Sequence, residues 1–230
     1  MAQGYFITGT DTNAGKTWVT VALLRNFATL GKRVVGMKPV AAGCDRQSGV
    51  LVNSDALQLL QASNVAVSYA QVNPYAYALP VSPHLAGQHR PVELAVLQQR
   101  YAELAAIADV VVVEGAGGWY SPLTATIDNA VLAQHLALPV ILCVPIRLGC
   151  INQARLSVQA IEQSQVACVG WIAVCVEADM LLRQENIDYL QAVLSVPLLG
   201  VLPFNASAEA GPVSASVALD NLQVNQWDIG

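Results

Sequence analysis

The sequence predicts an α/β fold in which one mostly parallel sheet is covered by helices on both faces. Apolar runs typical of strands alternate with longer segments of helical periodicity, and this alternation indicates βαβ units. Hydrophobic residues make up 54% of the 230 residues and charged residues only 12%. So few charges are expected when strands are buried on both faces and therefore form continuous apolar runs. We expect a single domain over residues 1–230.

Composition and charge exclude several classes of protein. The hydrophobic content is too high for an intrinsically disordered chain. The longest apolar runs, Val166–Val176 and Leu138–Ile146, are shorter than the ~20 residues of a membrane-spanning helix. A net charge of −5 disfavours nucleic-acid binding. The first residues lack the pattern of a signal peptide and the five cysteines form no C-x-x-C pair, so we expect a cytoplasmic protein with reduced thiols.

The first third of the chain is predicted to form two strands and two helices. Gly4–Thr8 is a short apolar strand, and Lys16–Leu30 has the apolar spacing of a helix that ends at Gly31. Arg33–Met37 is the second strand, because it is short and apolar. Asp55–Ala62 has helical spacing and is predicted as the second helix.

The middle of the chain begins with a long irregular connection. Residues 64–91 hold four prolines, three tyrosines and two histidines, a composition typical of loops. Val92–Ile107 then has apolar residues at helical spacing, and Val110–Val113 is the most apolar strand. Ile127–Leu136 is predicted as a helix and Val140–Val144 as a strand, which continues the alternation.

The last third repeats the same pattern. Ile151–Gln163 and Leu182–Leu194 are predicted helices, and Cys168–Val174 and Leu198–Leu202 are predicted strands. The residues after Pro203 are poorly patterned, so we expect only short elements there. A ligand of such a sheet is expected at the carboxyl ends of its strands.

A phosphate-binding loop is the strongest functional signal, in the stretch Gly9–Thr17. A glycine-rich turn between a strand and a helix presents backbone N–H groups to phosphate oxygens. Lys16 is expected to reach the β- and γ-phosphates, and the Thr17 hydroxyl to bind Mg²⁺. Gly9 and Gly15 are separated by five residues, one more than in the common loop. The alternative is a turn without chemical role, which the flanking strand and helix disfavour.

Two charged residues follow predicted strands. Lys38 comes directly after Arg33–Met37, and Glu114 comes directly after Val110–Val113. Parallel strands end at one edge of the sheet, so both residues are expected near the phosphate-binding loop. A second lysine there would offset the repulsion between two anions, and an acid would suit a metal site. The alternatives are a solvated loop lysine and a polar residue where a strand meets solvent.

Two helix starts also carry candidate ligand-binding residues. Asp55 could bind a metal ion, or Asn53–Asp55 could simply cap the following helix. The segment Leu148–Asn152 opens the helix Ile151–Gln163, where free N–H groups can bind a carboxylate. Asn152 either adds an amide donor to that site or is an ordinary helix-start residue.

The phosphate-binding loop and several later segments together resemble the dethiobiotin synthetase family. Each segment alone is weak, whereas their shared order from Tyr5 to about Leu202 is specific. The matching segments are Gly9–Thr17, Lys38–Ala41, Asn53–Ala56, Val72–Tyr75, Ser82–His84, Val113–Trp119 and Leu148–Asn152. The resemblance implies a P-loop NTPase-like α/β fold and a homodimer with the site at or near the subunit interface.

The resemblance also implies a reaction. The family is an ATP- and Mg²⁺-dependent ligase of biotin biosynthesis that joins CO₂ to 7,8-diaminopelargonate and releases dethiobiotin, ADP and phosphate. A substrate amine forms a carbamate, and a carbamate oxygen attacks the γ-phosphate to give a carbamic–phosphoric anhydride. The second amine then closes the cyclic urea and expels phosphate. The protein supplies positioning and charge stabilisation, so no side-chain nucleophile is needed.

Roles for individual residues follow from the matched segments. The implied catalytic residues are Lys16, Lys38 and Thr12, and the implied Mg²⁺ ligands are Thr17, Asp55 and Glu114. The nucleotide would contact Asn13, Ala14, Gly15, Lys16, Thr17, Trp18, Asp55, Glu114, Gly115, Ala116, Gly117, Pro203 and Phe204. The substrate would contact Thr12, Lys38, Gly118, Gly149, Cys150 and Asn152.

Four positions depart from the family pattern. Asn13 stands where an acid is common, Ala42 stands where a serine is common, and Val174-Cys175 replaces an Asn-Asp that reads the nucleotide base in some members. The last change leaves the base selectivity open.

Two other functions stay as alternatives. A partitioning-type P-loop ATPase switch is disfavoured because Thr10–Thr12 lacks the extra lysine of that class, and a nucleotide-binding homologue without ligase activity is disfavoured because Lys38 and the acids are present.

Overall fold

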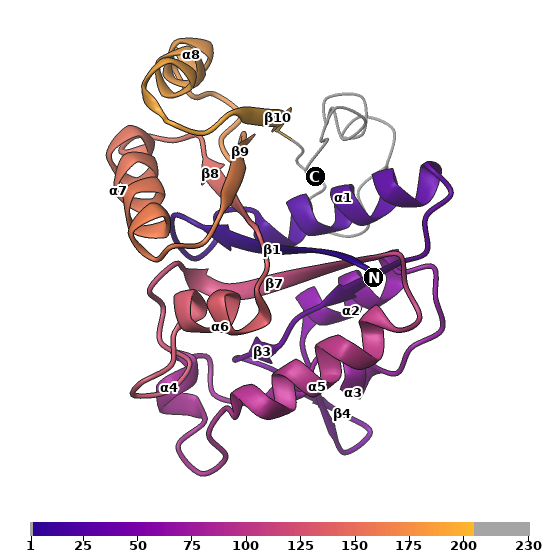
Figure 1. Ribbon diagram of the computed structural model, residues 1–230. Helices are drawn as coiled ribbons and strands as arrows, with labels where there is room; N and C mark the ends of the chain where they lie inside the picture. Colours follow the sequence, from indigo (N-terminus) through magenta and orange to yellow (C-terminus); the bar gives the residue numbers. More distant parts are fainter. Residues whose placement is uncertain (1, 205–230) are drawn as a thin grey trace.

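A six-stranded sheet forms the centre of the structure, a computed structural model that describes residues 2–204 (Figure 1). Every neighbouring pair of its strands is parallel, in the order β10-β9-β8-β1-β7-β2. The strands are β1 (Gln3–Gly9), β2 (Val34–Met37), β7 (Val110–Gly118), β8 (Val140–Pro145), β9 (Cys168–Val174) and β10 (Leu198–Leu202). The predicted parallel α/β fold is confirmed. The residues after Phe204 lie outside the described part, so the expectation of short elements there, and of one domain over the whole chain, stays a prediction.

Helices cover both faces of the sheet (Figure 1). The helices are α1 (Lys16–Thr29), α2 (Ser54–Ala62), α5 (Leu94–Ala105), α6 (Asn129–Leu136), α7 (Cys150–Gln163) and α8 (Arg183–Val193). α1 and α2 pack on one face, whereas α5, α6 and α7 pack on the other, with α8 against α7. Each helix was predicted to within a few residues, because each carries an apolar face at helical spacing.

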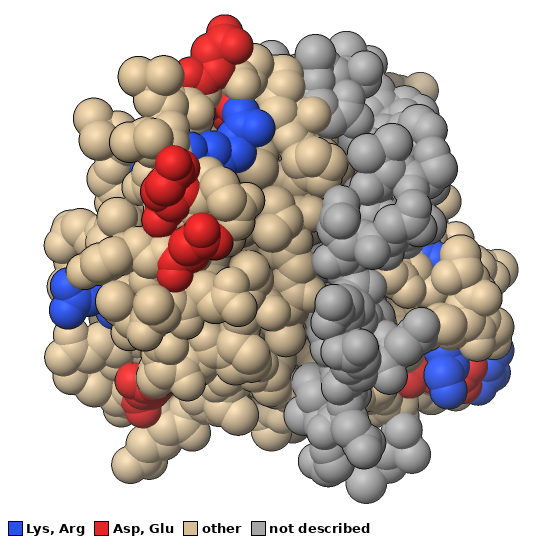
Figure 2. All heavy atoms as spheres, turned by 90° about the horizontal axis from the view of Figure 1, so that it is seen from above, with Lys and Arg blue, Asp and Glu red and all other residues tan. Residues whose placement is uncertain are grey.

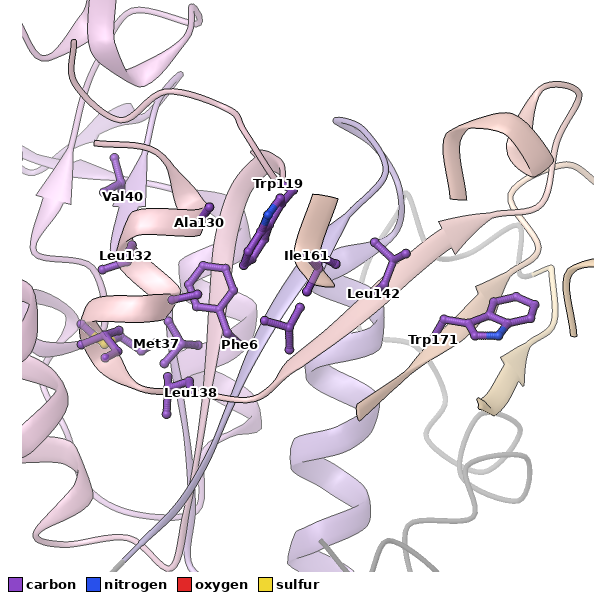
Figure 3. Packing of buried hydrophobic residues seen from close by; sticks show 14 of the residues in the cluster. Phe6, Met37, Val40, Trp119, Ala130, Leu132, Leu138, Leu142, Ile161 and Trp171 are labelled. Carbon is purple, nitrogen blue, oxygen red and sulfur yellow. The ribbon is translucent and has the colours of Figure 1, made fainter. Parts of the chain in front are cut away.

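Successive side chains of one strand point into two separate cores, as a strand requires. On β1, Tyr5 and Ile7 belong to the core beneath α1, whereas Phe6 belongs to the core on the opposite face. Figure 3 shows Phe6 beside Met37 and Trp119, and the Phe6 and Trp119 rings meet edge to face at 6.4 Å between centroids. Strands buried on both sides explain the continuous apolar runs and the low charged fraction.

The surface is poor in charged side chains, as the composition predicts. Figure 2 shows one face on which uncharged side chains predominate and the charged ones are few and scattered. Within residues 2–204, no helix is both long and apolar enough to cross a membrane.

Two connections contain short elements that the sequence did not reveal. Between β2 and α2 lie β3 (Val40–Ala41), β4 (Asp45–Gln47) and β5 (Val50–Val52), and between α2 and α5 lie α3 (Tyr69–Val72), β6 (Tyr75–Ala76) and α4 (Pro83–Ala86). β4 and β5 form an antiparallel hairpin, and its turn residues Ser48 and Gly49 have φ of 48° and 87°. Positive φ at both positions is typical of a tight hairpin turn. The flanking strands have three residues each, which is too few to show an alternating apolar pattern in the sequence.

Strand β7 is longer than predicted. The prediction ended at Val113, whereas the strand continues through Gly118. Its glycine end pairs with β1, where Gly9 lies opposite Gly118. The apolar pattern stops at Glu114, so hydrophobicity alone could not extend the strand.

Side chains from the end of α2 close the outer edge of β2, the last strand of the sheet. The Val34 N–H donates to Asn64 Oδ1 at 2.7 Å, and Asn64 Nδ2 donates to the Lys32 carbonyl at 2.8 Å. The Gly36 N–H donates to Ser63 Oγ at 3.0 Å. These bonds protect an edge that could otherwise pair with another chain.

Replacing Asn64 tests this edge. Asn64→Ala leaves the buried Val34 N–H without its acceptor, which should cost about 1–3 kcal/mol of unfolding free energy and lower Tm by about 2–4 °C per kcal/mol. Asn64→Asp keeps an acceptor and should lose less. Thermal and urea unfolding measure both variants, and an unchanged Tm in Asn64→Ala would contradict the assignment.

Candidate active site

The phosphate-binding loop connects β1 to α1 at the carboxyl edge of the sheet. Gly15 adopts a left-handed conformation (φ 79°) immediately before α1, and Asn13 also has a positive φ of 59°. No side chain caps the start of α1 and its first turn holds no acidic residue. The partial positive charge of this helix end is therefore open to an anion.

The Lys16 side chain lies over the loop that precedes it. Its residue is only 6% exposed, and its Nζ donates to the Asp11 carbonyl at 2.9 Å. Burial of the ammonium group, together with the nearby charge of Lys38, lowers the pKa of Lys16 below its ordinary value. An anion bound at the loop would stabilise the charged form, because a phosphate oxygen is a stronger partner than a carbonyl.

Lys38 is the centre of a buried ion cluster. Its Nζ donates to Glu114 Oε1 at 2.5 Å and to Asp55 Oδ2 at 3.1 Å. Burial opposes the charge on Lys38, but the two carboxylates outweigh it and raise the pKa of Lys38 above its ordinary range. Lys38 and Glu114 are 5% and 1% exposed, so each would leave an uncompensated buried charge if the other were removed.

Asp55 faces this cluster and does not cap its helix. The α2 cap is Asn53, whose Oδ1 accepts from the Ala56 N–H at 3.1 Å. Of the two interpretations of the Asn53–Asp55 segment, capping therefore applies to Asn53 alone. Burial opposes ionisation of Asp55, but the charge of Lys38 prevails and holds the pKa of Asp55 below its usual value.

The predicted metal ligands lie together around Glu114. The Thr17 hydroxyl donates to Glu114 Oε1 at 2.9 Å, and Lys38 bridges Glu114 to Asp55. The second oxygen, Glu114 Oε2, is buried and has no hydrogen-bond partner within the described residues, a costly arrangement unless a ligand contacts it. Two carboxylates and a hydroxyl are oxygen donors of the kind that Mg²⁺ prefers. The donor set therefore fits the predicted ion.

A cavity of about 1330 Å³ opens in front of these groups, a volume larger than that of most single-ligand sites. Most of the predicted site residues line it: Thr12, Asn13, Ala14, Gly15, Lys16, Thr17, Trp18, Lys38, Asp55, Glu114, Ala116, Gly117 and Phe204. Gly115, Gly118 and Pro203 adjoin lining residues without lining the cavity themselves. Ala42 and Cys175, at two positions that depart from the family pattern, also line it.

The predicted substrate residues at the start of α7 do not line this cavity. Gly149 and Asn152 are exposed, whereas Cys150 is fully buried in the core. The Cys150 side chain is therefore unavailable to a ligand, and its N–H already donates to the Arg147 carbonyl at 3.0 Å. Within one copy of the chain, Gly149, Cys150 and Asn152 are therefore outside the cavity lining that most of the other predicted site residues share.

The structure also adds residues that are absent from the predicted set of site residues. Arg147 lines the cavity and donates to Asp11 Oδ2 at 3.2 Å, which links the β8–α7 connection to the phosphate-binding loop. Ser121 lines the cavity and accepts from the Gly118 N–H at 2.8 Å. Asn129, fully buried behind the cavity wall, bonds to the backbone of Ala116 and Gly118. The Asn129 side chain bonds to backbone atoms of another segment, so no sequence motif marks it.

A glycine turn, a buried lysine and a helix end open to anions, all at the carboxyl edge of a parallel sheet, define a P-loop nucleotide-binding protein. Residues 3–211 match a family model described as an AAA domain. Among solved structures, the MinD cell division protein of Aquifex aeolicus is 15% identical with a TM-score of 0.60, over 95% of this chain and 94% of that one. MinD of Pyrococcus horikoshii, complexed with Mg-ADP, is 16% identical with a TM-score of 0.56, over 96% and 87%. These likenesses concern the fold alone.

The chain belongs to the ATP-dependent dethiobiotin synthetase family. A protein of that name from Nitrosospira multiformis is 45% identical over 94% of both chains. Another from Xanthomonas oryzae pv. oryzae is 46% identical over 94% of this chain and 97% of the relative. The one from Aromatoleum aromaticum is 43% identical over the same shares. The resemblance seen in the matched segments is thereby confirmed.

The Asp55–Lys38 pair predicts a specific dependence of stability on pH. Asp55 has a lower pKa in the folded than in the unfolded chain, so its contribution is complete above about pH 4 and is lost as the pH falls through the folded-state pKa. The Asp55 side chain is 37% exposed, and solvent screening limits the contribution to about 1 kcal/mol. Asp55→Asn should therefore flatten the loss of unfolding free energy between pH 5 and 2.

Urea unfolding across this pH range measures the effect. Asp45→Asn, on the exposed hairpin strand β4, is the matched control and should keep the acid profile of the unmodified protein. Identical profiles for Asp55→Asn and Asp45→Asn would contradict the prediction.

Proposed function

We propose that this protein catalyses the ATP-dependent formation of dethiobiotin from 7,8-diaminopelargonate and CO₂, with release of ADP and phosphate. The reaction is that of its family, whose members match it at 43–46% identity over nearly their whole length. The structural observation that carries the proposal is the pair of buried lysines, Lys16 and Lys38, at one cavity. A reaction between a carbamate and a γ-phosphate must bring two anions together, and two cations there reduce their repulsion.

The two lysines are suited to different tasks. Glu114 and Asp55 keep Lys38 protonated, because they raise its pKa. Lys38 therefore offers a fixed positive charge and hydrogen-bond donors to the carbamate and to the transferring phosphoryl group, and it does not act as a base. Lys16 lies at the start of α1 and would contact the β- and γ-phosphates together with the backbone N–H groups of Asn13–Thr17. Thr12 lines the same cavity and would orient the carbamate.

Magnesium would complete the charge balance. Thr17, Asp55 and Glu114 would hold the ion, which would neutralise charge on the phosphate oxygens of ATP. The unpartnered Glu114 Oε2 supports this assignment. The chain itself contributes orientation of the reacting groups and a partly enclosed cavity, and the chemistry requires no covalent intermediate with a side chain.

A homodimer would explain the position of the α7 start. Gly149 and Asn152 are exposed and do not line the cavity of their own chain, so we infer that this segment serves the cavity of a second copy and binds the substrate carboxylate through the helix end. Leu148, which is 97% exposed, would then be covered by the partner. The family reaction is biosynthetic, and we place the protein in the cytoplasm.

Direct assay tests the function. Protein supplied with diaminopelargonate, bicarbonate and MgATP should release dethiobiotin and ADP in equal amounts, measured by mass spectrometry and a coupled ADP assay. Folded protein that forms neither product would contradict the proposal, and ADP without dethiobiotin would favour the ATPase alternative. Substituting CTP and GTP for ATP determines the base selectivity that Val174 and Cys175 leave open.

Replacing Lys38 tests its role. Lys38→Met should lower kcat by about 10²–10³-fold, as for other groups that stabilise charge in a transition state, while the Kd for MgATP rises less than about tenfold. Lys32→Met is the matched control, since Lys32 is exposed and should keep full activity. Equal losses of turnover and of nucleotide affinity in Lys38→Met would reassign Lys38 to nucleotide binding.

A further inference from the structure

Asn129 is a fully buried polar residue outside the set of predicted ligands. It is the first residue of α6 and is 0% exposed. The α6 cap is its neighbour Asp128, whose Oδ1 accepts from the Val131 N–H at 2.9 Å. The Asn129 side chain is therefore not used to start its own helix, and its burial needs another explanation.

The Asn129 amide binds the glycine end of β7. Its Nδ2 donates to the Ala116 carbonyl at 2.8 Å and to the Gly118 carbonyl at 2.7 Å. Its Oδ1 accepts from the Ala116 N–H at 3.3 Å. Both N–H donors and the carbonyl of the amide are thus bonded to a single stretch of backbone, which no apolar or purely accepting side chain could reproduce.

This stretch lacks side chains that could hold it in place. Gly115 leaves room for the amide, since a Cβ there would lie 3.0 Å from Asn129 Oδ1. Gly117 has a φ of 77°, which a side chain would strain. Beyond it, Ser121 completes the support by accepting from the Gly118 N–H at 2.8 Å. The segment is therefore fixed by hydrogen bonds to its backbone and not by packing of its own side chains.

The same stretch forms a wall of the cavity against the phosphate-binding loop. Ala116 and Gly117 line the cavity. A Cβ on Gly118 would lie 3.4 Å from the Gly9 carbonyl oxygen, and one on Gly117 would lie 3.7 Å from Thr12 Oγ1. A shift of the wall would therefore move it into, or away from, the loop that carries Thr12.

We propose that Asn129 is a positioning residue for this reaction. Its amide sets the distance between the wall, residues 116–118, and the phosphate-binding loop, and so fixes the phosphate end of the cavity. The inference rests on the proposed function and extends it to a residue that lies behind the cavity wall and does not line the cavity. Displacements of about 1 Å in such a site cost up to about 10²-fold in rate.

The main test is Asn129→Asp, which has the same shape but no N–H to donate to the two carbonyls. Its kcat for dethiobiotin formation should fall about 10–100-fold. The matched control is Asp128→Ala, which removes the α6 cap at a cost of about 1 kcal/mol but leaves the Asn129 bonds intact. Its kcat should stay within about twofold of the unmodified protein. Urea unfolding measures the stability of each variant.

Hydrogen exchange gives a readout that does not depend on activity. The Ala116 N–H, which donates to Asn129 Oδ1, should exchange slowly in the unmodified protein and in Asp128→Ala. It should exchange faster in Asn129→Ala, the second variant. This measurement keeps the two proposals apart, because it stands even if the unmodified protein forms no dethiobiotin.

Three outcomes would overturn the inference. One is an Asn129→Asp enzyme whose kcat is unchanged. Another is an Asn129→Asp enzyme that loses no more kcat than Asp128→Ala at equal loss of stability. The third is rapid exchange of the Ala116 N–H in the folded, unmodified protein, which decides the question even if both Asn129 variants fail to fold.

Discussion

The buried contact of Lys38 with Glu114 and Asp55 is the constraint on which the site depends. It joins the residue after β2 and the middle of β7 to the first turn of α2, so three separate segments must converge at one point. Neither Lys38 nor Glu114 is tolerable in the interior alone, because an unpaired buried charge is costly. The parallel sheet makes the convergence possible, since it ends neighbouring strands at one edge.

The balance of charges at that edge prepares the site for an anionic ligand. Lys16 and Lys38 carry two positive charges, and Asp55 and Glu114 carry two negative ones, so the side chains balance and the uncapped end of α1 adds a partial positive charge. An incoming polyphosphate would bring an excess of negative charge, which the helix end and a divalent cation would offset. The site is thus preorganised for anions before any ligand arrives, and preorganised dipoles and charges are what transfer of a phosphoryl group requires.

The sequence predicts this part of the protein well, for a physical reason. Lys38 directly follows β2 and Glu114 directly follows the apolar run of β7, and a parallel sheet binds its ligands at the carboxyl edge, so their proximity follows from local pattern alone. Asn129 could not be found this way, because its partners are backbone atoms 11 and 13 residues away and only the folded chain brings them together. The start of α7 is a helix end, as predicted, but its role in the proposed dimer depends on a second chain that no local pattern describes. The β4–β5 hairpin could not be predicted, because strands of three residues are too short to show an alternating pattern.

The scarcity of lysine has a practical consequence. The chain holds three lysines, and the amines of Lys16 and Lys38 are buried and hydrogen-bonded to oxygen atoms. Lys32, at the amino end of β2, is the exposed one, and it lies at the opposite edge of the sheet from the cavity. An amine-reactive dye or coupling resin should therefore modify Lys32 in the folded protein and spare Lys16 and Lys38, at a point away from the cavity. Because the chain has so few lysines, and two of them are buried, the protein is suited to site-selective conjugation.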